Sequence, residues 1–284
     1  MAVSTGADLV GRDAELSDIA DWLAGAEGGE DSGREHVLAL EGDPGIGKTT
    51  LWAEAVRRAC QRNWTVLDCR PRPSDVGLPH LGLTDLLRPV TDEAIGELPR
   101  PQCRALLIAT LREEPGHEAL DPLAVAIGLA ALIGAQAARG RLLLAVDDLQ
   151  WMDRASARAL AFALSRVRTQ AVRCLATVRL EGARRDSAAL AAMDSTLERE
   201  RWRRIQIGPL SVAALHRVLV STLGQPIARP LLVRIYMATA GNPFYALEVA
   251  RELQRVGPPP PGRPLPVPPD QRDMALLRVR RLPQ

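Results

Sequence analysis

The segment from Gly42 to Thr49 constrains this chain more than any other, because Gly-Asp-Pro-Gly-Ile-Gly-Lys-Thr fits the phosphate-binding pattern G-x-x-x-x-G-K-[ST]. The chain has 36 lysine and arginine residues in total, and Lys48 is the only lysine among them. An ammonium group is a compact point charge, whereas a guanidinium is a wide planar fork that fits less easily between phosphate oxygens. The segment therefore predicts a strand–loop–helix unit that binds a nucleoside triphosphate.

The composition excludes several other classes of protein. The chain has 284 residues and a formal net charge of +2, so it lacks the broadly basic surface of a nucleic-acid-binding domain. Its four cysteines are scattered without a C-x-x-C pair, which argues against a metal–thiolate site or a disulfide framework. The apolar run 123–135 is too short to cross a bilayer, and residues 1–8 lack the pattern of a signal peptide. We therefore expect a reduced, cytoplasmic protein without a membrane partner.

Short apolar runs that alternate with helical spacing predict an α/β fold with a parallel sheet covered by helices on both faces. Beyond about Gly208 the strands stop, and three helices are expected from Ser211 to Leu223, from Pro230 to near Gly241, and from Phe244 to Val256. Eight of the thirteen residues in 257–269 are proline, which predicts a linker without helix or sheet. The expected strands are Val37–Glu41, Thr65–Cys69, Leu142–Val146, Val172–Thr177 and Arg204–Ile207.

The glycine loop supplies the first part of the predicted site. Its glycines allow the backbone to direct amides at phosphates, and the following helix adds the positive end of its dipole. We expect Lys48 to contact the β- and γ-phosphates and the Thr49 hydroxyl to bind Mg²⁺. The predicted nucleotide-binding residues of this segment are Gly42, Asp43, Pro44, Gly45, Ile46, Gly47, Lys48, Thr49 and Thr50.

Acidic and basic residues at the ends of two later strands supply the second part. Asp147 and Asp148 follow the apolar run 142–146, so their carboxylates should lie at the carboxyl edge of the sheet, where ligands bind in open α/β sheets. We expect Asp147 to hold Mg²⁺ and Asp148 to orient or deprotonate the attacking water. Thr177 and Arg179 end the next strand, and Arg179 is expected to sense the γ-phosphate.

Two further segments, together with the acidic motif, resemble a known family. Residues 9–16, Leu-Val-Gly-Arg-Asp-Ala-Glu-Leu, look like the N-terminal segment of the STAND class of AAA-related signalling ATPases. Residues 240–244, Ala-Gly-Asn-Pro-Phe, look like the helical-domain motif of that class, and residues 147–153 are similar to its extended Walker B stretch. Within the class, the resemblance is to the large ATP-binding regulators of the LuxR type, and it covers most of residues 9–256.

The resemblance implies a five-stranded sheet in the order 5-1-4-3-2, followed by a helical lid. It also implies that Val10, Gly11 and Arg12 cover the adenine side of the nucleotide and that Pro243 packs near the base. The expected domains are a P-loop ATPase core (1–208), a helical lid (209–256), a proline-rich linker (257–269) and the start of a truncated winged-helix-like domain (270–284). DNA is then expected as a partner only through a C-terminal domain that these residues do not include.

The leading functional prediction is a cytoplasmic ATP/ADP switch that needs Mg²⁺, hydrolyses ATP slowly, and changes conformation or self-association with its nucleotide. Slow turnover is expected because the second acid is Asp148, shorter than the glutamate usual in AAA-type machines. Two alternatives remain open at this point. One is an interaction module that holds ADP permanently without turnover. The other is a P-loop kinase for a small molecule, for which Arg184 and Arg185 are the only lid candidates.

Overall fold

A computed structural model of the chain describes residues 9–25, 35–117, 119–167, 169–179, 187–257, 259–260 and 263–265. Its centre is a five-stranded sheet in which every neighbouring pair is parallel, in the order β2-β3-β4-β1-β5. This order is 5-1-4-3-2 read from the opposite edge, so the expected P-loop NTPase sheet is confirmed. The strands are β1 (Val37–Gly42), β2 (Thr65–Cys69), β3 (Leu142–Val146), β4 (Val172–Arg179) and β5 (Trp202–Gln206).

Burial along the strands follows their place in the sheet. Every residue of β1 and β3 is buried, as expected for central parallel strands covered on both faces. The edge strand β5 was predicted at Arg204–Ile207, but it begins two residues earlier, at Trp202, and ends one residue earlier, at Gln206. Its arginines are held by acids. Arg203 pairs with Asp18 of the first helix at 2.6 Å, and Arg204 pairs with Glu41 of β1 at 2.5 Å. Polar side chains with such partners can occupy a sheet edge that an apolar pattern does not mark.

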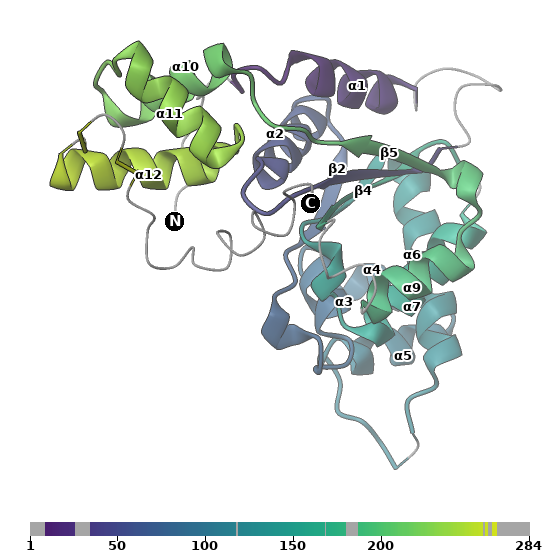
Figure 1. Cartoon of the computed structure of the whole chain (residues 1–284). Helices are drawn as coiled ribbons and strands as arrows, with labels where there is room; N and C mark the ends of the chain where they lie inside the picture. The colour runs from purple at the N-terminus through teal and green to yellow at the C-terminus, as the bar shows by residue number, and fades with distance from the viewer. Residues whose placement is uncertain are drawn as a thin grey trace. The chain divides into compact units, whose positions relative to one another are not determined.

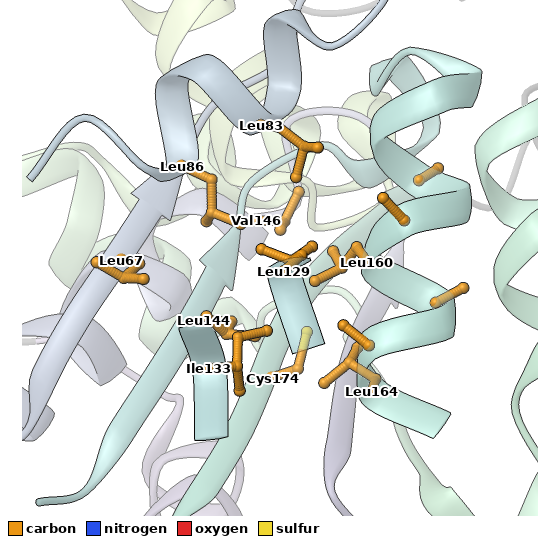
Figure 2. Packing of buried hydrophobic residues seen from close by; sticks show 14 of the residues in the cluster. Leu67, Leu83, Leu86, Leu129, Ile133, Leu144, Val146, Leu160, Leu164 and Cys174 are labelled. Atoms are coloured by element: carbon orange, nitrogen blue, oxygen red, sulfur yellow. The ribbon is translucent and has the colours of Figure 1, made fainter. Parts of the chain in front are cut away.

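Helices cover both faces of the sheet (Figure 1). Helices α1 and α2 lie on one side, while α5, α6, α7 and α9 lie on the other. The larger core forms on this second side, where leucines of α3, α6 and α7 pack against β3 and β4 (Figure 2). The helices of this part are α1 (Asp13–Ala24), α2 (Lys48–Gln61), α3 (Leu81–Leu86), α4 (Asp92–Gly96), α5 (Arg100–Ala109), α6 (Pro122–Arg139), α7 (Arg154–Arg166) and α9 (Ala188–Thr196).

Helix α6 is the one described helix that is long and apolar enough to cross a membrane, with 18 residues and a mean hydropathy of 1.5. Six of its residues are buried, and five of these, among them Leu129 and Ile133, belong to the core shown in part in Figure 2. A helix that packs one face against a sheet passes the same test of length and composition, so the finding is weak evidence for a span. The apolar run predicted from 123 to 135 lies inside this helix.

Three helices after the sheet form a second compact part, with α10 at Val212–Leu223, α11 at Arg229–Thr239 and α12 at Pro243–Val256. Ser211, at which the first of these helices was expected to begin, caps α10 by accepting a hydrogen bond from the Ala214 amide. The helices enclose their own core, which includes Leu215, Leu219 and Ile235. The expected helices of this region therefore match the structure to within a few residues.

The described residues of the proline-rich segment form neither helix nor strand, and they contact the helical part. Arg234 of α11 donates to the carbonyl oxygens of Pro259 and Arg263 at 3.3 and 2.6 Å, and Leu265 packs against the helical core. The expected winged-helix-like start at residues 270–284 lies outside the described residues, as do Arg184 and Arg185.

The chain divides into two compact units. One holds the sheet and its helices, in residues 14–43 and 48–207. The other holds the helical part from residue 208, the N-terminal segment up to Asp13, and the middle of the glycine loop, Pro44–Gly47. The glycine loop therefore contributes residues to both units.

Candidate functional site

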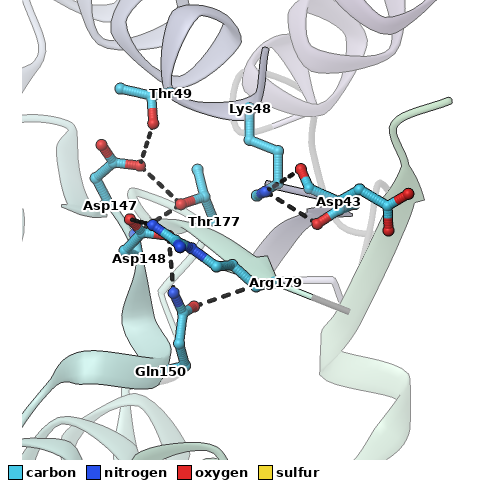
Figure 3. Close-up of polar contacts among 9 residues, drawn as sticks. Asp43, Lys48, Thr49, Asp147, Asp148, Gln150, Thr177 and Arg179 are labelled. Atoms are coloured by element: carbon cyan, nitrogen blue, oxygen red, sulfur yellow. Dashed lines mark hydrogen bonds and ion pairs between the residues drawn. The ribbon is translucent and has the colours of Figure 1, made fainter. Parts of the chain in front are cut away.

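The glycine loop joins the end of β1 to the start of α2, and its backbone requires glycine at two positions. Gly45 and Gly47 have φ angles of 75° and 106°, which side chains disfavour. Lys48 opens α2 and is only 5% exposed; its Nζ donates to the carbonyl oxygens of Gly42 and Asp43 at 2.9 Å each (Figure 3). Burial lowers the pKa of Lys48, although nearby carboxylates oppose this effect. The single lysine is thus held against the loop backbone.

Asp147 lies directly after β3 and beside the end of β4, because Val146 pairs with Ala176 in the sheet register. Its Oδ1 accepts hydrogen bonds from the hydroxyls of Thr177, at 2.7 Å, and Thr49, at 3.1 Å (Figure 3). Burial raises the pKa of Asp147, and the two hydroxyl bonds oppose that shift. The structure therefore brings together Thr49 and Asp147, the two residues predicted to hold the metal.

Asp148 follows in a left-handed conformation, with φ 57° and ψ 51°, and its amide donates to the Thr177 hydroxyl at 2.7 Å. Arg179 binds both of its carboxylate oxygens, with Nε at 3.1 Å and Nη2 at 3.0 Å, and Gln150 donates to it at 2.8 Å (Figure 3). Burial opposes ionisation, but the hydrogen bonds from Arg179 and Gln150 hold the pKa of Asp148 below its ordinary value. Asp148 is therefore an ionised carboxylate paired with the arginine that was predicted to sense phosphate.

The oxygens of Thr49 and Asp147 fit a magnesium ion. Mg²⁺ binds oxygen ligands at about 2.0–2.1 Å in octahedral geometry, so two adjacent ligands lie about 3 Å apart. Thr49 Oγ1 and Asp147 Oδ1 are 3.1 Å apart. No cluster of three or more histidine, cysteine, aspartate or glutamate side chains occurs among the described residues. Such a pair suits an ion whose remaining ligands are water and phosphate oxygens, as is usual for Mg²⁺.

The segments predicted to contact the adenine belong to the helical unit. Arg12 is 5% exposed, and its Nη2 donates to the carbonyl oxygen of Ile46 at 2.8 Å. Gly11 has a φ of 73°, and a Cβ there would lie 2.5 Å from the Cβ of Ala214. Val10 packs against the helical core, and Pro243 is the first residue of α12. Arg12 is thus placed on the backbone of the glycine loop, while Thr50 is exposed in the first turn of α2.

Two polar residues of this region were not predicted as site residues. Gln150 bridges two predicted site residues: its Nε2 donates to the Asp148 carboxylate, and its Oε1 accepts from the backbone N–H of Arg179 at 3.3 Å. Asn242 is 6% exposed and donates to the carbonyl oxygen of Pro44 at 2.9 Å. An asparagine before a proline is a sequence signal for a helix N-cap, which Asn242 indeed is, but the contact with the loop has no sequence signal.

Three features together define the P-loop NTPase class: a parallel sheet with this strand order, a glycine-loop motif with Lys48 after β1, and Asp147 directly after β3. Residues 8–178, more than half of the chain, match the model of the AAA ATPase domain. The chain therefore belongs to the AAA ATPase domain family.

Solved structures agree with this fold. A Walker-type ATPase of Pyrococcus abyssi is 16% identical, with a TM-score of 0.52 over 88% of this chain and 69% of that one. Cdc6p of Pyrobaculum aerophilum is 15% identical, with a TM-score of 0.50 over 90% of this chain and 65% of that one. A STAND protein of Pyrococcus horikoshii with a tetratricopeptide-repeat sensor is 17% identical over 86% of this chain and 30% of that one; its TM-score of 0.46 carries no argument.

At these identities the similarities show the fold alone. The chain spans about two thirds of the length of the first two structures. No match was found among curated proteins.

Proposed function

We propose that this chain is the nucleotide-dependent switch module of a STAND-class regulator of the LuxR type, which binds Mg²⁺·ATP and hydrolyses it slowly. The observation that carries the proposal is the convergence of Lys48, Thr49, Asp147 and Asp148 at the carboxyl edge of one parallel sheet. In this proposal Lys48 contacts the β- and γ-phosphates, and Thr49 and Asp147 hold Mg²⁺, which neutralises charge on the phosphate oxygens. The LuxR context rests on the resemblance of residues 9–16, 147–153 and 240–244.

The surroundings of Asp148 support slow turnover. A general base works best when its pKa lies near the working pH, and hydrogen bonds from Arg179 and Gln150 hold the pKa of Asp148 below its ordinary value. Its carboxylate is also occupied by the guanidinium of Arg179. Asp148 can orient water in this environment, but it is a weak base, and Arg179 must move before a water molecule can take its place.

Steady-state hydrolysis of Mg²⁺·ATP by wild-type protein and Asp148→Asn tests the proposal. We expect slow wild-type turnover and a loss of about 10²-fold in the variant, the lower end of the usual contribution of a general base because Asp148 is a weak one, with ATP still bound. Asp68→Asn is the matched control, because Asp68 is an exposed acid of β2 in the same sheet, and it should turn over like wild type. Unchanged hydrolysis in Asp148→Asn would remove Asp148 from the mechanism.

The same experiment separates the alternatives. Tightly held ADP with no wild-type turnover would support an ADP-locked interaction module in place of the ATPase. Phosphate transfer to an added small-molecule acceptor faster than hydrolysis would support a kinase. Sedimentation in ADP and in a non-hydrolysable ATP analogue then tests switching, since a switch that works by self-association should sediment differently in the two nucleotides. DNA binding and regulatory contacts, in this proposal, belong to further domains of the regulator.

A further inference from the structure

The side chain of Asn242 makes hydrogen bonds in two directions. Its Oδ1 caps α12 by accepting from the amides of Phe244 and Tyr245, at 3.1 and 3.5 Å. Its Nδ2 donates to the carbonyl oxygen of Pro44 in the glycine loop, at 2.9 Å. Both ends of one buried carboxamide are therefore used, one for the helix and one for the loop. The loop middle and α12 belong to the same compact unit.

Asn242 is one of three groups that hold consecutive carbonyls of the loop. The amide of Phe244 donates to Gly45 O at 3.4 Å, and Arg12 donates to Ile46 O at 2.8 Å. In a trans peptide the C=O and the following N–H point in opposite directions, and the described residues contain no cis bond. Holding the carbonyls of residues 44, 45 and 46 therefore directs the amides of residues 45, 46 and 47 away from Asn242, Phe244 and Arg12.

The backbone before Asn242 is fixed by its own geometry. Ala240 and Gly241 have φ angles of 50° and 74°, so the chain makes two consecutive left-handed steps after α11. Gly241 also accepts a hydrogen bond from the Leu210 amide at 3.0 Å, and a Cβ on it would lie 2.7 Å from the Leu210 oxygen. A side chain placed by such a constrained turn has little freedom to leave the loop.

We propose that Asn242 is a positioning residue of the nucleotide site. Its side-chain amide holds the Pro44 carbonyl so that the backbone amides of the loop face the phosphates. Because the same side chain caps α12, a displacement of the loop also displaces the N-terminus of α12. The inference rests on the proposed function, because it assumes that the loop binds phosphate. It adds a regulatory contact by which the helical unit responds to the nucleotide through the loop backbone.

The variant Asn242→Asp separates the two bonds of the side chain. Aspartate caps helices about as well as asparagine does, so α12 keeps its cap. The donor to Pro44 O is lost, however, and a carboxylate oxygen then faces a carbonyl oxygen. Ser211→Asp is the matched control, because it places the same charge on the N-cap of α10 in the same unit, where the side chain bonds to the Ala214 amide and not to the Pro44 carbonyl. Asn242→Ser is a second variant, whose hydroxyl can cap α12 but is too short to reach Pro44.

Calorimetric titration with ADP and ATP gives the first readout. We expect Asn242→Asp and Asn242→Ser to bind both nucleotides at least about tenfold more weakly than wild type, which corresponds to about 1.4 kcal/mol. Ser211→Asp should bind like wild type, and all three variants should melt within a few degrees of it. Wild-type affinity in both Asn242 variants, or equal losses in Asn242→Asp and Ser211→Asp, would overturn the proposal.

The amide resonances of Gly45 and Gly47 in nucleotide-free protein give a readout that does not depend on nucleotide binding. We expect both resonances to shift in Asn242→Asp and to stay in place in Ser211→Asp. Unshifted resonances in Asn242→Asp would refute the contact with the loop. If the wild-type protein binds no nucleotide, the proposed function fails, and the glycine resonances still decide whether Asn242 orients the loop.

Discussion

Replacing Arg179 with methionine tests whether this arginine distinguishes ATP from ADP. In the structure its guanidinium binds both carboxylate oxygens of Asp148, at 3.1 and 3.0 Å. Arg179 also ends β4 beside Gly42, the first residue of the glycine loop, because the two are paired in the sheet register. We expect the γ-phosphate to compete with Asp148 for the guanidinium, and Arg179→Met removes that competition while it keeps a side chain of similar length.

The expected loss of ATP affinity follows from the difference between two partners of the Arg179 guanidinium, the γ-phosphate and the Asp148 carboxylate. A hydrogen bond to a charged group contributes about 1.5–3 kcal/mol, whereas a partly exposed ion pair contributes about 0–1 kcal/mol. The side chains of Arg179 and Asp148 are 36% and 24% exposed, so their pair belongs to the weaker kind. The exchange therefore favours ATP by about 0.5–3 kcal/mol, and the variant should lose about 2- to 150-fold in ATP affinity. ADP lacks the γ-phosphate and should bind as before.

Calorimetric titration with a non-hydrolysable ATP analogue and with ADP measures both affinities. Arg203→Met is the matched control, because it breaks a surface pair with Asp18 at 2.6 Å and should alter neither affinity. Equal losses for the analogue and ADP in Arg179→Met would show that the arginine stabilises the site without recognising the γ-phosphate. An unchanged affinity ratio would refute the sensing role.

Three further predictions concern stability. Asp153→Ala removes a carboxylate that is 2% exposed and accepts hydrogen bonds from three backbone N–H groups. Urea unfolding should show that the free energy of unfolding falls by about 3 kcal/mol or more, and a fall of less than about 1 kcal/mol would refute this. Burial and the charge of Arg173 lower the pKa of His36, so its stabilising effect is present above its unfolded pKa of about 6.5 and is lost as the pH falls. His36→Gln should therefore reduce the loss of stability between about pH 7 and pH 5, and an identical loss would contradict the argument. Gly241→Ala should lower the melting temperature more than Gly224→Ala does. The φ angles of the two glycines are similar, 74° and 67°, but only a Cβ at residue 241 meets a backbone oxygen, that of Leu210 at 2.7 Å. Equal shifts in melting temperature would be evidence against this argument.

The strands and the approach of Thr49 to Asp147, the two proposed metal ligands, could be predicted from the sequence because both depend on local patterns. Continuous apolar runs marked four of the strands to within two residues, and the glycine loop fixed the place of Lys48 and Thr49. Asp147 could be predicted because an acid at the end of a buried parallel strand can point only to the ligand edge of the sheet. The strand order itself came from the resemblance to a family, since periodicity does not determine which strands are neighbours.

Other parts of the site depend on contacts that no local pattern contains. The pairing of Arg179 with Asp148 joins residues 31 positions apart, and the bond from Asn242 to Pro44 joins residues 198 positions apart. In a chain rich in arginine, sequence alone does not show which guanidinium finds which carboxylate. The expectation that Arg12 lies on the adenine side stays a prediction, and its bond to Ile46 O is a contact that the family motif does not specify.

Calorimetric titration of the whole chain with Mg²⁺·ATP and Mg²⁺·ADP, beside Lys48→Ala, tests the central claim most directly. The account predicts saturable binding of one nucleotide per chain by the wild-type protein and none by the variant, because Lys48 supplies the ammonium that the loop holds for phosphate. Folded wild-type protein that gives no heat with either nucleotide, and that carries none from its purification, would contradict the account, as would unchanged affinity in Lys48→Ala.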